Sequence, residues 1–147
     1  MTVRSDERKQ VPKESASKVQ PSRAVNKQFS KDALGWGFVL WLIGYALGVA
    51  LFAFVPASLI GWMITPFATA LTFWVAFKKV KGSTLQYLGL VGLVWLVIAL
   101  VGDYLFIVKA FKPADGYYKA DVYLYYVLTL AIPLFAGWRR HSARARR

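Results

Sequence analysis

The chain has 147 residues, of which 57% are hydrophobic, and it carries a formal net charge of +12 and no cysteine. This hydrophobic fraction is too high for a soluble protein of one domain. The lack of cysteine excludes disulfides, thiol catalysis, iron–sulfur clusters and cysteine-bound zinc, and the single histidine, His141, lies in a basic tail. We therefore expect an integral membrane protein without a cofactor or a metal site.

The chain begins with a polar segment, residues 1–33, that is rich in lysine, arginine, serine and glutamine. Such a segment buries too little apolar surface to offset the entropy of ordering, so we predict a disordered basic tail. No small-residue cleavage pattern follows it, unlike a signal peptide. Ser30 fits a helix N-cap with Asp32 in the first turn, and this start belongs either to a short interfacial helix or to the first span.

Four apolar segments follow the tail, and each is long enough to cross the roughly 30 Å hydrocarbon core as a helix. Short connections join them, so consecutive segments are expected to be antiparallel neighbours. We predict an all-α membrane protein, a four-transmembrane-helix bundle of two antiparallel hairpins, with a second basic tail at residues 139–147. The predicted spans are residues 34–55, 58–77, 84–108 and 120–138.

The first span carries three glycines on one helix face, Gly37, Gly44 and Gly48. Two small residues four positions apart allow the backbone of a neighbouring helix to approach closely. We expect this face to pack inside the bundle, and self-association of the protein through it is the alternative.

Lysine and arginine are distributed unevenly, since 16 of the 19 lie in the two tails and the connection at residues 78–81. With four spans these regions share one side, which the positive-inside rule assigns to the cytoplasm. We expect a multi-pass protein of the cytoplasmic (inner) membrane with both termini in the cytoplasm and with anionic lipid headgroups bound at the basic tails. Nucleic-acid binding is not expected, because the tails have neither interleaved aromatic residues nor a folded module.

The segment Gly102–Tyr126 holds three of the seven acids and six of the eight tyrosines. Within it, Pro113–Gly116 has the signature of a turn in which glycine supplies a positive φ. The acids fit this turn and the first turn of the fourth helix, and the tyrosines fit an interfacial belt. The same groups would suit recognition of a lipid headgroup or a sugar, for which the candidates are Asp115, Tyr117, Tyr118, Asp121 and Tyr125.

Asp103 lies inside the third predicted span, where a carboxylate costs about 2–3 kcal/mol unless it faces protein or water. The helix face that it shares with Ala99 and Gly92 carries small residues, so we expect its side chain to point into the bundle. Three interpretations stay open: a polar clamp, an ion, proton or substrate site, and an interface to a partner protein. The expected partner is a lysine or a tyrosine hydroxyl of the fourth helix, and the candidate residues are Asp103, Tyr104, Lys109, Lys112 and Lys119.

The stretch DYLFIVKAFKPADGYYKADVYLYY resembles part of a group of small prokaryotic four-helix integral membrane proteins. The resemblance covers mainly Gly102–Trp138, and it implies no known activity.

No nucleophile–base pair or metal-ligand set can be assembled from the predicted spans, so enzymatic activity is not expected. We expect a structural, accessory or interaction protein of the membrane, either as a homo-oligomer or with a membrane-protein partner. The alternative is a small oligomeric transporter or channel that uses Asp103. A transporter requires a water-accessible path to Asp103, whereas an accessory protein would bury it dry and hydrogen-bonded.

Overall fold

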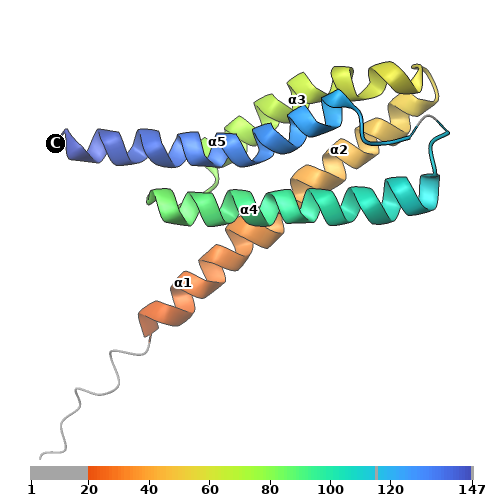
Figure 1. Ribbon diagram of the computed structural model, residues 1–147. Helices are drawn as coiled ribbons and strands as arrows, with labels where there is room; N and C mark the ends of the chain where they lie inside the picture. The colour runs from red at the N-terminus through yellow and green to blue at the C-terminus, as the bar shows by residue number, and fades with distance from the viewer. Residues whose placement is uncertain (1–19, 115, 147) are drawn as a thin grey trace, which may run out of the picture.

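The computed structural model describes residues 20–114 and 116–146, and in these residues every regular element is a helix (Figure 1). Three of the elements, α1, the π-helical segment η2 and α2, follow one another without a break, and so do α4 and the π-helical segment η3. The elements are α1 Gln20–Ser30, η2 Lys31–Gly35, α2 Trp36–Phe52, α3 Ala57–Lys78, α4 Leu85–Gly102, η3 Asp103–Phe111 and α5 Ala120–Ala145.

Four helices of the described chain are long and apolar enough to cross a membrane. The predicted all-α class is therefore confirmed, and the number of helices that could span a membrane equals the predicted number of spans. The apolar helices run over Val25–Phe52, Ala57–Lys78, Leu85–Phe111 and Ala120–Ala143.

The first helix begins earlier than the sequence indicated. Residues 20–33, which we assigned to a disordered tail, are helical, and Ser30 lies in mid-helix without a capping hydrogen bond, so both expectations are wrong. The reason is tertiary, because Asp32 and Ala33 are buried against the rest of the bundle. The remainder of the predicted tail, residues 1–19, lies outside the described residues.

The third and fourth long helices extend past their predicted C-terminal limits, whereas the first ends at Phe52 instead of residue 55. The third long helix continues through η3 to Phe111 instead of ending at residue 108. The last helix, α5, continues to Ala145, so most of the predicted C-terminal tail is helical. Between these helices, Gly116 has φ +76° and its N–H donates to the Pro113 carbonyl at 3.1 Å, which confirms the predicted turn.

The two ends of the bundle differ in what they carry. The connection from α2 to α3 and the segment from Lys112 to Lys119 lie at one end, which we name the loop end (Figure 1). The connection from α3 to α4 and the C-terminal end of α5 lie at the opposite end, which we name the tail end.

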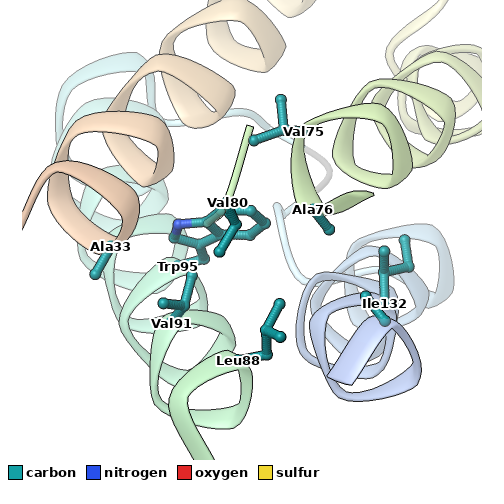
Figure 2. Close-up of a cluster of buried hydrophobic side chains, with 9 residues drawn as sticks. Ala33, Val75, Ala76, Val80, Leu88, Val91, Trp95 and Ile132 are labelled. Carbon is teal, nitrogen blue, oxygen red and sulfur yellow. The ribbon is translucent and has the colours of Figure 1, made fainter. Parts of the chain in front are cut away.

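The core forms around two tryptophans. Towards the tail end the Trp95 indole lies between the helices, with its nitrogen directed to the helix that carries Ala33 (Figure 2). Trp41 and Tyr126 occupy the corresponding position towards the loop end. Small residues bring α4 and α5 close together, since a Cβ on Gly92 would lie 3.2 Å from the Pro133 ring.

Candidate functional site

Asp103 is the most strongly hydrogen-bonded side chain at the loop end. It begins η3, is only 4% exposed, and receives three hydrogen bonds. Trp41 Nε1 of α2 donates to Oδ1 at 2.9 Å, whereas the hydroxyls of Tyr117 and Tyr126 donate to Oδ2 at 2.7 and 2.8 Å. The carboxylate therefore joins the first, third and fourth long helices and the connection before α5.

Aromatic rings surround this carboxylate. The Trp41 indole stacks on Tyr45 at a centroid distance of 5.4 Å and meets Phe106 at 5.2 Å. Gly102 makes this position possible, because a Cβ there would overlap the Trp41 ring. The missing side chain at residue 102 thus lets an indole reach the acid at residue 103.

We expect Gly102→Ala to push the Trp41 indole away from Asp103 and to lower the free energy of unfolding by about 1–3 kcal/mol. Gly44→Ala is the matched control, because no heavy atom of the described residues lies within 4 Å of a Cβ at Gly44. The measurement is unfolding in mixed micelles titrated with sodium dodecyl sulfate. Equal stability of the two variants would contradict the proposed role of Gly102.

Tyr117 lies outside the long helices, in the connection before α5. Burial, followed by the nearby Asp103 carboxylate, raises the pKa of its phenol above the ordinary value. A raised pKa keeps the phenol neutral up to strongly alkaline pH. Tyr117 therefore remains a hydrogen-bond donor to Asp103 throughout the neutral range.

A second buried aspartate, Asp32, holds the tail end together. It is 1% exposed and accepts hydrogen bonds from Gln28 Nε2 at 2.7 Å, the Tyr87 hydroxyl at 3.0 Å and the Lys81 backbone N–H at 3.1 Å. Its own carbonyl accepts from Trp95 Nε1 at 3.0 Å. Asp32 thus connects the first helix to α4 and to the connection between α3 and α4.

The two aspartates form a reciprocal arrangement between the first and third long helices. The first helix supplies Asp32 and Trp41, and the third supplies Trp95 and Asp103. The Trp41 indole donates to the Asp103 carboxylate, whereas the Trp95 indole donates to the backbone carbonyl of Asp32. Each aspartate also lies within a π-helical segment, η2 or η3. A π-helical turn holds an extra residue and shifts the facing of the side chains, which is a common feature of functional positions.

Arg140 of α5 also contacts the connection between α3 and α4 at the tail end. Its guanidinium donates to the carbonyls of Ala76 and Phe77 at 2.9 Å and of Val80 at 3.0 Å, and also to Gly82. Two of these carbonyls belong to the last turn of α3, where orphan carbonyls and the helix dipole favour a cation. Residues 80–82 are therefore fixed by Asp32 on one side and by Arg140 on the other.

A cavity of about 180 Å³ opens beside Asp103 at the loop end, and we name it the loop-end cavity. Asp121, 5% exposed, lines it, and its carboxylate lies so close to Gly61 of α3 that a Cβ there would overlap it. Asp121 lies in the first turn of α5, as expected, but the sequence did not indicate that it would be buried. The polar side chains that line this cavity are Tyr45, Thr65, Asp103, Tyr117, Lys119, Asp121 and Tyr125.

The other predicted site residues differ in their surroundings. Tyr104 and Tyr118 are exposed, and Lys109 lies over the Tyr104 ring at 5.6 Å. Lys119 and Tyr125 line the loop-end cavity. Asp115 lies outside the described residues.

The three predicted packing glycines have different surroundings. A Cβ on Gly37 would lie 2.6 Å from the Trp95 ring, so this glycine allows close packing of the first and third helices. Gly44 and Gly48 instead line the loop-end cavity, and the close helix approach expected at Gly44 is not found among the described residues. Their missing side chains leave space instead of a tight contact.

Sequence reasoning missed Asp32, Trp41 and Arg140. Asp32 and Arg140 stand within charged segments that resemble solvated tails, which concealed their burial. One signal was available: the first and third long helices each hold an aspartate and a tryptophan eight or nine positions apart in opposite order.

The described residues contain no group of three or more histidine, cysteine or acidic side chains that could hold a metal ion. The chemistry of the site consists of two carboxylates, Asp32 and Asp103, that are held by hydrogen bonds inside an apolar bundle. Comparisons of the chain with protein-family models, curated proteins and solved structures find no match.

Proposed function

We propose that the protein is a non-enzymatic structural or accessory component of the cytoplasmic membrane. In this proposal Asp103 is a polar clamp that fixes the helices of the bundle. The supporting observation is the set of three hydrogen bonds from Trp41, Tyr117 and Tyr126 to Asp103, together with its 4% exposure. A carboxylate with both oxygens occupied by protein donors is suited to holding helices and poorly suited to exchanging an ion.

The proposal includes two antiparallel hairpins across the bilayer with both tails in the cytoplasm. The strong excess of lysine and arginine at the tail end supports this orientation. Lys79, which lies over the rings of Trp36 at 5.9 Å and Trp74 at 4.8 Å, fits a belt at the cytoplasmic headgroups. In this setting the described basic residues of the tail end contact anionic lipid.

The cysteine-free chain allows a direct test of orientation. We expect a membrane-impermeant maleimide to label Ala114→Cys at the loop end in intact cells. Ser142→Cys, near the end of α5, should react only after permeabilisation, because both tails lie in the cytoplasm. Labelling of Ser142→Cys in intact cells would contradict the orientation.

A second candidate function is a small oligomeric transporter or channel. One observation favours it, because Asp103 lines the loop-end cavity. In that case the three hydrogen bonds would have to open to admit an ion or a proton. The two candidates differ in whether charge moves through the protein.

Reconstituted vesicles distinguish the two candidates. With the wild-type protein we expect proton and potassium fluxes no larger than in empty vesicles, and a partner protein or a second copy retained during purification from native membranes in mild detergent. Asp103→Asn is the test variant, and Tyr104→Phe, which alters the adjacent exposed residue, is its control. A wild-type flux that Asp103→Asn abolishes, with folding retained, would favour transport.

A further inference from the structure

A second cavity adjoins the loop-end cavity halfway along the bundle. It measures about 290 Å³ and lies between α2 and α3, and we name it the mid-span cavity. Gly44 and Tyr125 line both cavities, so the two spaces meet at these residues. The mid-span cavity is lined almost wholly by apolar groups, with Leu40, Leu47 and Phe67 among them.

Glycine keeps the junction of the cavities open. Within the part of the chain that the structure describes, no heavy atom lies within 4 Å of a Cβ at Gly44. At Gly48, one turn farther along, the only such neighbour among these residues is Ile64 Cδ1 at 3.6 Å. The wall of the mid-span cavity reaches the outer surface of the bundle, since Phe67 is 70% exposed. A chain-like molecule can therefore enter this space sideways from the surrounding bilayer.

The mid-span cavity suits an acyl chain better than water. A buried water requires two to four polar partners, and the walls offer few, whereas an apolar chain needs only shape. Within a bilayer the molecules that lie against such a wall are lipid chains. The mid-span cavity is thus a place for hydrocarbon.

The loop-end cavity has a different character. Its lining includes two carboxylates, Asp103 and Asp121, but one amine, Lys119. This balance favours a cation, and the rings of Tyr45 and Tyr125 in the wall also attract an ammonium group. Because Asp103 is already coordinated by three donors, Asp121 is the carboxylate best placed to meet a ligand.

We propose that the two cavities together bind one membrane lipid with an ammonium-bearing headgroup. The headgroup lies in the loop-end cavity beside Asp121, and one acyl chain passes Gly44 into the mid-span cavity. The inference rests on the proposed membrane setting but not on the structural role of Asp103, so each can fail while the other stands.

Native mass spectrometry tests the apolar half of this site. The purified protein is mixed in detergent with phosphatidylethanolamine, or with phosphatidylglycerol of the same acyl chains, which lacks the ammonium. We expect one phosphatidylethanolamine per chain and preference over phosphatidylglycerol by about tenfold. Gly44→Leu fills the junction and should abolish retention, whereas Ala46→Leu, which adds the same side chain at an exposed position of α2, should not.

The headgroup half has its own variant. Asp121→Asn should remove the roughly tenfold preference while an apolar chain still enters, because the carboxylate is lost and the junction is open. Three results would overturn the proposal: equal lipid retention by Gly44→Leu and wild type, equal binding of the two lipids by wild type, or displacement of the lipid by soluble ethanolamine. A lipid-free dimer that Gly44→Leu dissociates would also overturn the proposal, since a second copy of the chain would then fill the mid-span cavity.

Discussion

Asp103→Leu is expected to lower the free energy of unfolding by roughly 2–5 kcal/mol, from three hydrogen bonds at about 0.6–1.7 kcal/mol each. Leucine has the same branching at Cγ but no acceptor, so the donors of Trp41, Tyr117 and Tyr126 would be left without a partner. The substitution also removes the desolvation cost of a buried carboxylate. We expect the loss from the donors to prevail, because all three would lose a charged acceptor at a position that is only 4% exposed.

The measurement for Asp103→Leu is unfolding in mixed micelles, with Tyr104→Phe as the control. Tyr104 is adjacent and exposed, so its loss of a hydroxyl should change stability by less than about 0.5 kcal/mol. The stability of Asp103→Asn should lie between those of Asp103→Leu and Tyr104→Phe, because the amide oxygen of asparagine still accepts a hydrogen bond. A stability of Asp103→Leu equal to that of the wild type would contradict the clamp.

Arg140→Met is expected to lower the free energy of unfolding by about 1–3 kcal/mol, which is the second large effect. Methionine keeps much of the length of arginine but cannot donate to the carbonyls that end α3 or to residues 80–82. The upper end of that range is reduced because the guanidinium is only partly buried, and water can replace some of its contacts. The connection from α3 to α4 should then loosen as well.

Arg139→Met is the matched control for this change, since Arg139 is exposed and carries the same charge at the adjacent position. Hydrogen exchange of the backbone amides of residues 79–82 gives a local readout in addition to stability. We expect faster exchange in Arg140→Met and wild-type exchange in Arg139→Met. Equal exchange in the two variants would show that net charge, and not the specific contacts, stabilises this connection.

The fold was predictable because hydrocarbon imposes a simple requirement on sequence. Apolar segments of about 20 residues must form helices in lipid, and this fixes the number of spans without knowledge of packing. The limits of the spans were harder to predict. Residues 20–33 and 139–145 are helical, and within them Asp32 and Arg140 find partners in the bundle that composition does not reveal.

The site was predictable only in part. Asp103 stood out because an isolated acid within an apolar segment requires a partner, and the fourth helix supplies Tyr126 as expected. The Trp41 donor did not stand out, since its position depends on the space that Gly102 leaves. The cavities could not be foreseen either, because Gly44 and Gly48 are equally typical of tight helix packing.

The two aspartate–tryptophan pairs link the first and third long helices. One pair closes the loop end and the other the tail end, so the first and third long helices are tied at two distant points. Between them, the α2–α3 seam keeps the space in which we place a lipid. The central claim is that the buried carboxylates act as structural acceptors.

A double-mutant cycle between Asp103→Leu and Tyr126→Phe tests this claim most directly. Tyr126→Phe removes only the hydroxyl that donates to Asp103 Oδ2 at 2.8 Å. We predict that it lowers the free energy of unfolding in the wild-type background but not in the Asp103→Leu background, with a coupling of about 0.6–1.7 kcal/mol. Equal effects of Tyr126→Phe in both backgrounds would contradict the account.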